Sequence, residues 1–248
     1  MHREDTLGGW GDKGKAAYFF EQADIVIPKR REQIALLAEL LPWPTDEALA
    51  VLDLGAGFGA VTEEILGRYP HATVTCVDGS AEMMALGRAR LGKYGERVRL
   101  RHGDLAEAGW RADIGAGFHA AVSALAIHHV SDERKRALCR EVFAMLVPGG
   151  IFLNNDPVTI PAALKDRFEA LLYRQIQEQE RTLRGRARPI EEIRTEMNAG
   201  LRSDGHHSPI APLAAQLEWL AEAGFESVDC YWRFLNLAIV GGVKPSAA

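Results

Sequence analysis

The residues of this 248-residue chain that point most directly to chemistry are three glycines after a short apolar run. Gly55, Gly57 and Gly59 follow residues 51–54 in a G-x-G-x-G pattern. Because glycine has no Cβ, it lets a strand turn sharply into a helix and lets the backbone approach a ligand. Ligands of open α/β sheets bind beyond the carboxyl ends of the strands. The pattern therefore predicts a ligand site here, with a tight bend alone as the simpler alternative.

Carboxylates follow the next two predicted strands. Asp78 ends the second strand, where a carboxylate can accept hydrogen bonds from two ribose hydroxyls. Asp104 ends the third strand, where a carboxylate can accept a hydrogen bond from an adenine amino group. Met83 and Leu105 lie near these strand ends and are suited to sandwich a flat base. A single aspartate after a strand is more often a helix cap, but here four strand ends present ligand-type groups on one rim.

Two histidines follow the fourth predicted strand. His128 and His129 are able to accept a proton near neutral pH. Adjacent residues of an extended chain point to opposite sides, so we expect only one of them to serve a ligand, and a packing or capping role is the alternative. A second pair, His206 and His207, has no cysteine pair or further ligand set beside it, so no metal site is expected.

The elements that must position these residues alternate between strand and helix. This alternation predicts a parallel sheet with helices on both faces, within a single α/β domain. The last two strands are expected to pair antiparallel at the sheet edge. The predicted strands span residues 50–54, 72–78, 98–101, 119–127 and 151–155, with two more between 227 and 240; the predicted helices span 60–69, 80–91, 131–146 and 211–223.

Two segments lie outside this alternation. Residues 1–45 are expected to form an N-terminal arm and a helix over 17–41, ended by Pro42. Residues 162–208 are expected to form a charged helical cap insertion, broken at Pro189, that helps to select the acceptor. Tyr18 in the first segment and Arg194 in the second are candidate substrate contacts. The simpler alternatives are a core aromatic cluster and a solvated helix face.

Composition excludes several classes of protein. A formal charge of −5 argues against a nucleic-acid surface. The 47% hydrophobic and 25% charged residues are typical of a globular domain. No apolar run approaches the roughly 20 residues of a membrane span, and no signal-peptide core follows Met1. The three cysteines lie far apart, which is typical of a reducing cytoplasm. A homodimer is left open.

Together the motifs resemble the class I S-adenosylmethionine (SAM)-dependent methyltransferases. The resemblance implies a three-layer, Rossmann-like fold with a seven-stranded sheet, an antiparallel last strand and SAM as cofactor. Its carriers are VLDLGAGFG (51–59), VDGS (77–80), GDL (103–105), ALAIHH (124–129) and LVPGG (146–150). It implies SAM contacts at Asp53, Gly55, Ala56, Gly57, Asp78, Gly79, Met83, Asp104, Leu105 and Ala124.

The resemblance also implies methyl transfer by in-line displacement, in which the enzyme mainly positions the reactants. A base is needed only where the acceptor loses a proton, and His129 or His128 is the candidate. The acidic balance favours a small-molecule acceptor. One alternative is carboxy-SAM synthesis, because residues 170–243 are distantly similar to the carboxy-SAM synthases. In that family an arginine at the position of Arg194 holds the extra carboxylate, but Ala124 stands where it has a polar residue. The other alternative is a SAM-binding module without catalysis.

Overall fold

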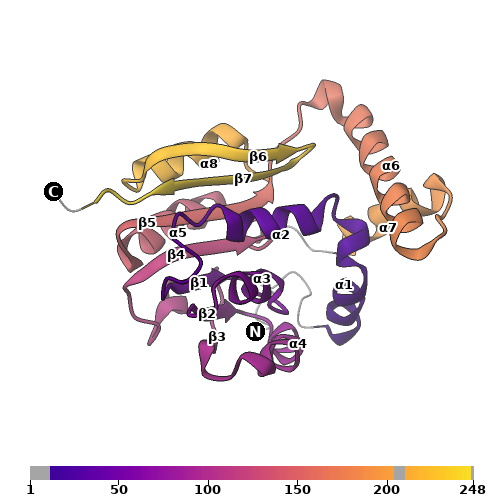
Figure 1. Ribbon diagram of the computed structural model, residues 1–248. Coiled ribbons are helices and arrows are strands. Elements are labelled where there is room, and N and C mark those ends of the chain that lie inside the picture. The colour runs from indigo at the N-terminus through magenta and orange to yellow at the C-terminus, as the bar shows by residue number, and fades with distance from the viewer. Residues whose placement is uncertain (1–11, 204–209, 247–248) are drawn as a thin grey trace, which may run out of the picture.

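A computed structural model describes residues 12–203 and 210–246 (Figure 1). Within these residues seven strands form one sheet in the order β3-β2-β1-β4-β5-β7-β6. β7 runs antiparallel to both of its neighbours, while the other pairings are parallel. The strands are β1 Ala50–Leu54, β2 Thr73–Asp78, β3 Val98–His102, β4 Phe118–Ala124, β5 Leu146–Pro157, β6 Glu226–Phe234 and β7 Leu237–Val243.

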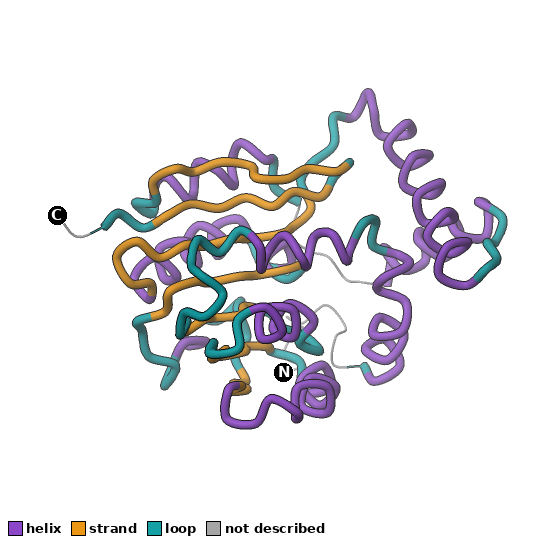
Figure 2. The backbone as a smooth tube through the Cα atoms, viewed as in Figure 1, coloured by secondary structure: helices purple, strands orange, loops and turns teal. Residues whose placement is uncertain are grey.

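Helices cover both faces of the sheet, which confirms the predicted three-layer α/β fold (Figures 1 and 2). α2, α3 and α4 pack on one face, and α5 and α8 on the other. The α-helices are α1 Lys13–Val26, α2 Arg30–Glu39, α3 Ala60–Arg68, α4 Ala81–Leu91, α5 Asp132–Met145, α6 Lys165–Arg184, α7 Ile190–Ser203 and α8 Leu213–Glu222; short 3-10 turns are η1 Gly92–Arg97, η2 Ala108–Arg111, η3 Ile127–His129 and η4 Ala162–Leu164.

The side chains of the central strands alternate between the two cores. Val51 packs under α2 and α3, whereas Leu52 packs under α5 and α8. Because successive side chains of a strand point to opposite faces, the same rule decides where polar residues at the strand ends lie. Asp53 therefore lies on the side of Val51.

The helix predicted over residues 17–41 is wrong in one respect, because the chain forms two helices there. α1 ends at Val26 and α2 begins at Arg30. Pro28 lies between them, and a proline in a helix interior removes a backbone hydrogen bond and clashes with the preceding turn. Lys29 takes the left-handed conformation, with φ of 55°. The break sets α2 at a new angle, with Arg30 at its first turn.

α6 holds this break in place. The side-chain amide of Gln179 donates to the carbonyls of Asp24, Ile25 and Ile27, at 2.9, 2.9 and 3.1 Å. Its oxygen accepts from the backbone N–H of Lys29 at 2.8 Å. One side chain of the 162–208 segment thus satisfies backbone groups that the broken helix leaves over. Figure 1 shows α6 and α7 beside α1, beyond one end of the sheet.

Two predicted strands have other bounds. The strand predicted over 119–127 ends at Ala124, because Leu125 takes the left-handed conformation and Ile127 begins the η3 turn; the strand predicted over 151–155 is longer and spans Leu146–Pro157.

Ser80 and Ser131 cap α4 and α5 by accepting from the backbone N–H three residues on, as their type predicts. The chain breaks between α6 and α7, where Pro189 predicts it. No helix in the described ranges is long and apolar enough to cross a membrane.

The two glycines of the α3 region predict opposite effects of substitution by alanine. Gly59 precedes α3 with φ of +79°, and a Cβ there would lie 2.4 Å from Leu91 Cδ1. We expect Gly59→Ala to lower the free energy of unfolding by about 1–3 kcal/mol, from strain and overpacking. Gly67 lies inside α3, and a Cβ there meets no atom within 4 Å. Gly67→Ala should raise stability by about 0.5–1 kcal/mol. Urea unfolding checks both, and equal effects would contradict the packing described here.

Candidate functional site

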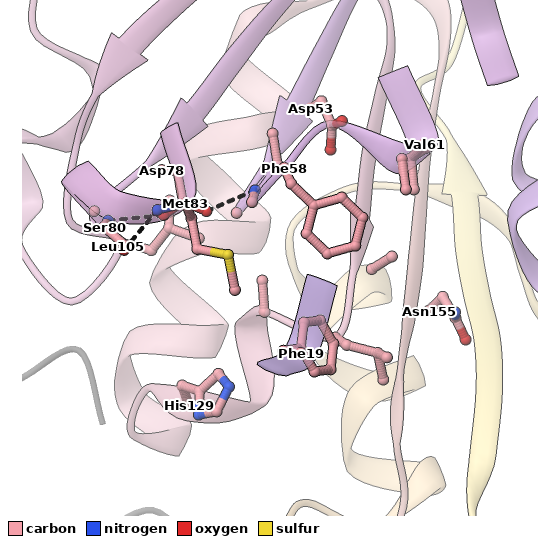
Figure 3. A pocket seen from close by; sticks show the side chains of 18 of the residues that line it. Phe19, Asp53, Phe58, Val61, Asp78, Ser80, Met83, Leu105, His129 and Asn155 are labelled. Carbon is pink, nitrogen blue, oxygen red and sulfur yellow. Dashed lines mark hydrogen bonds between the residues drawn. The ribbon is translucent and has the colours of Figure 1, made fainter. Parts of the chain in front are cut away.

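A pocket lies beyond the carboxyl ends of β1, β2 and β4, where the glycine pattern predicts a ligand (Figure 3). The space between its residues, including the open mouth, is about 1060 Å³, enough for a ligand of nucleoside size. Eleven of the residues predicted from the sequence line it: Asp53, Gly55, Ala56, Gly57, Asp78, Gly79, Met83, Asp104, Leu105, Ala124 and His129.

The glycine turn forms one wall of this pocket. Gly55 has φ of +65°, and a Cβ there would lie 2.1 Å from the Cβ of Ala126. Only glycine permits this approach between the β1 turn and the chain after β4. A Cβ at Gly57 would meet nothing within 4 Å, so the backbone there borders open space. The turn thus leaves backbone exposed to a ligand.

Asp78 joins two turns of the pocket. Its Oδ2 accepts from the backbone N–H of Gly57 at 2.7 Å, and its Oδ1 accepts from that of Ser80 at 2.7 Å, as the dashed lines in Figure 3 show. Each carboxylate oxygen retains a lone pair for a further donor, such as a ribose hydroxyl. Burial raises the pKa of Asp78, although these two N–H groups oppose the rise.

The apolar walls beside Asp78 suit a flat base. Met83 and Leu105 are buried and line the same pocket as Asp104. Asp104 Oδ1 accepts from the backbone N–H of Ala106 at 2.9 Å. This end of the pocket therefore combines apolar surface with carboxylates, which fits an adenosine group.

Asp53 is fully buried on β1. Its Oδ2 accepts from the hydroxyl of Thr62 at 2.6 Å. Burial raises the pKa of Asp53 to about 7; the Thr62 hydrogen bond lowers it, and the nearby charge of Asp78 raises it further. Asp53 thus changes charge near neutral pH on the wall of the pocket.

The end of β4 separates the two histidines. His129 lines the pocket, whereas His128 turns to the other face of the sheet and its Nδ1 lies 2.8 Å from Asp156 Oδ1. Their rings still stack, with centroids 4.0 Å apart. Leu125 just before them has φ of 57°, a strained conformation of the kind often found at functional sites. Of the two histidines, His129 alone is in position to meet a ligand in this pocket.

The two candidate substrate contacts lie outside the pocket lining. Tyr18 is 45% exposed on α1, and its neighbour Phe19 lines the pocket instead. Arg194 on α7 pairs with Glu191 and lies over the ring of Tyr173. His206 and His207 lie outside the described residues. Within the described ranges, no three His, Cys, Asp or Glu side chains gather as a metal site would require.

Several lining residues carry no sequence motif. Phe19, Arg30 and Gln33 come from α1 and α2, and Asn155 from β5. They precede or follow the glycine turn by many residues, so only the fold brings them to it. The bend at Pro28 is the one sequence signal that indicates how α2 reaches the pocket.

The pocket fits SAM in shape and charge. The lining residues include the carboxyl groups of Asp53, Asp78 and Asp104, which suit a ligand that carries a sulfonium and an ammonium charge. Asn155 adds a buried side-chain oxygen with no donor among the described residues, which a ligand N–H or O–H would satisfy. When bound, SAM supplies an activated methyl group.

Comparison with known proteins agrees with this geometry. Residues 51–150 match a sequence family that is described as a methyltransferase domain. A carboxy-S-adenosyl-L-methionine synthase of Chromohalobacter salexigens is 30% identical over 200 residues, covering 79% of this chain and 68% of that protein. A trans-aconitate 2-methyltransferase of Variovorax paradoxus is 35% identical over 114 residues, covering 46% of this chain and 40% of that protein.

A solved structure shares the fold across the whole chain. Human N-acetylserotonin methyltransferase in complex with SAM superimposes with a TM-score of 0.64 at 16% identity, covering 99% of this chain and 61% of that one. At that identity the likeness supports the fold alone. Motifs, pocket and sequence relatives agree, and the chain therefore belongs to the class I SAM-dependent methyltransferases, the family that its motifs predict, with SAM as cofactor.

Proposed function

We propose that this chain transfers the methyl group of SAM to a small-molecule acceptor by in-line displacement. The observation that supports it best is that α1 and α2 border the pocket: Phe19 of α1 and Arg30 of α2 line it and pack against Phe58 of the glycine turn, and Figure 3 shows Phe19 beside Phe58. A pocket bordered by these helices admits a small acceptor more readily than a polymer. The acidic balance of the chain supports the same choice over nucleic acid.

In this proposal the chain's own residues mainly bind and orient. Asp78 holds the ribose, Met83 and Leu105 enclose the base with Asp104 at its edge, and the turn at Gly55 and Gly57 holds the methionine end by backbone contacts. His129 accepts a proton where the acceptor must lose one. His128 and its partner Asp156 fix the η3 turn behind it. α6 and α7 act as a cap that keeps α1 and α2 in position.

We also propose the cytoplasm as its compartment, because all three cysteines are free thiols. Sedimentation velocity would distinguish a monomer from a homodimer.

Carboxy-SAM synthesis is the second candidate function, favoured by the match that covers 79% of this chain. Arg194 lies outside the pocket lining and pairs with Glu191, which disfavours a carboxylate contact there. Mass spectrometry of the ligand that co-purifies separates the two functions by the mass of the extra carboxyl group. A third alternative, a binding module without catalysis, would bind SAM yet methylate no acceptor.

The cofactor role of Asp78 predicts a loss of affinity when its charge is removed. We expect the wild-type protein to bind S-adenosylhomocysteine, and Asp78→Asn to bind it roughly 10- to 100-fold more weakly, because an amide cannot replace a carboxylate opposite N–H and O–H donors. Titration calorimetry measures both. Asp46→Asn, an exposed site, serves as control. A wild-type protein that binds neither S-adenosylhomocysteine nor SAM would refute the proposed function.

The buried carboxyl of Asp53 predicts a pH-dependent stability. Its pKa is about 7 when folded and near 3.8 when unfolded, so the folded state holds the extra proton between these values. The carboxyl therefore lowers stability as pH rises through this window. The free energy of unfolding of Asp53→Asn relative to wild type should therefore increase from about pH 4 to about pH 8, on the order of 2–4 kcal/mol in total. Urea unfolding at several pH values tests this; a constant difference between the two proteins would contradict it.

The position of His129 predicts an effect on turnover alone. With an acceptor that loses a proton, such as a phenol, we expect His129→Asn to slow methyl transfer by about 10²- to 10⁴-fold. Its affinity for S-adenosylhomocysteine should stay within about twofold of wild type. Transfer of a labelled methyl group to a panel of phenols, amines and carboxylates provides the rate. An unchanged rate with the phenol that is methylated would exclude His129 as the base.

A further inference from the structure

The lining of the pocket includes polar side chains that the proposed contacts to the ribose, the base and the glycine turn do not use. Arg30 and Gln33 extend from the first turn of α2, and Asn155 from β5. None of the three belongs to a motif. Figure 3 shows Asn155 on the opposite side of the pocket from Asp78 and Ser80.

Arg30 is a mostly buried cation in the pocket lining. Its side chain is 13% exposed, Nη1 donates to Asp24 Oδ1 at 2.6 Å, and its guanidinium lies 5.3 Å from the ring centre of Phe58. No other acceptor for its N–H groups occurs in the part of the chain that the structure describes. Among the described lining residues it is the one arginine or lysine. Because an arginine stays charged, its unused donors favour an anion.

Asn155 lies in a fixed orientation beside this cation's helix. Its Nδ2 donates to Gln33 Oε1 at 2.7 Å, and Gln33 in turn donates to the carbonyl of Pro28. Asn155 is 2% exposed, and its Oδ1 accepts from no donor within the described ranges. A buried acceptor without a donor costs about 1–3 kcal/mol, which a ligand N–H or O–H would recover.

The position of Arg30 in its helix adds to its charge. It is the first residue of α2, whose ten residues carry a positive partial charge at this end. Gln33, one turn later, accepts the hydrogen bond from Asn155, so the strand that carries the orphaned acceptor is tied to the helix that Arg30 begins. Asp53 also lines the pocket and favours a positively charged group. The lining therefore offers one cation, Arg30, to a carboxylate, and two acceptors, Asn155 and Asp53, to an ammonium or hydroxyl group.

We propose that Arg30 anchors a carboxylate-binding subsite, in which Asn155 Oδ1 accepts a hydrogen bond from a donor on the same ligand. The inference rests on the proposed function. Two sources of the carboxylate share this chemistry: the amino-acid end of SAM, and a carboxylate of the acceptor. A carboxylate acceptor needs no base, because it reacts without losing a proton.

The test compares ligands with and without a carboxylate. S-adenosylhomocysteine carries the amino-acid end, and 5′-methylthioadenosine has the same nucleoside without it. Calorimetry measures both ligands on the full-length wild type, Arg30→Met and Arg31→Met. Arg31 is the matched control, because it binds the same Asp24, at 2.9 Å, from a side chain that is 73% exposed outside the pocket lining. The third ligand is trans-aconitate, a tricarboxylate, added to the protein with methylthioadenosine bound.

Two results support the subsite. If the carboxylate is that of SAM, Arg30→Met lowers the affinity for S-adenosylhomocysteine roughly 10- to 100-fold and leaves the affinity for methylthioadenosine unchanged. If it belongs to the acceptor, Arg30→Met changes neither nucleoside, but trans-aconitate raises the melting temperature of wild type and not of the variant. Arg31→Met behaves as wild type in both cases.

Two results overturn it. The first is an equal loss of affinity for both nucleosides in Arg30→Met. The second is unchanged affinity for both nucleosides together with no effect of trans-aconitate on the melting temperature of wild type. Either would show that no carboxylate is bound there. Should Arg30→Met fail to fold, Arg30→Lys with the same ligands decides, since lysine keeps the charge but not the two-pronged geometry. Wild type that binds neither nucleoside would instead refute the proposed function, which keeps the two failures distinct.

Discussion

The rest of the site depends on the carboxylate of Asp78. Its two oxygens accept the backbone N–H groups of Gly57 and Ser80, each at 2.7 Å. It thereby fixes the turn after β1 against the turn after β2. Both turns precede a helix, so this one side chain sets where α3 and α4 begin relative to each other. The pocket is bordered by both of these turns, which the carboxylate joins.

Strand alternation then distributes the other polar groups. On β5, Asn155 faces α2 and the pocket, while Asn154 faces the opposite side with Asp156. After β4, His129 enters the pocket and His128 pairs with Asp156. In each of these two pairs of neighbouring residues, one side chain therefore lies on one face of the sheet and the other side chain on the opposite face. Groups that look redundant in sequence have separate surroundings in the fold.

The sequence predicts the local elements well, because each depends on neighbouring residues. The glycine turn, the serine caps and the break at Pro189 follow from residue type alone. The pocket lining depends on contacts between distant segments, so Arg30 and Asn155 have no local signal. Pro28 does carry one, and a prediction of a continuous helix over 17–41 overlooks it. Only the fold shows that Gln179 of α6 binds the backbone freed at that break.

We infer that SAM binds across these strand ends with its ribose at Asp78. A crystal structure with S-adenosylhomocysteine tests it most directly. We expect the ribose hydroxyls within hydrogen-bond distance of the Asp78 carboxylate and the adenine between Met83 and Leu105. A ligand bound elsewhere, or bound here with its ribose away from Asp78, would refute this placement of SAM.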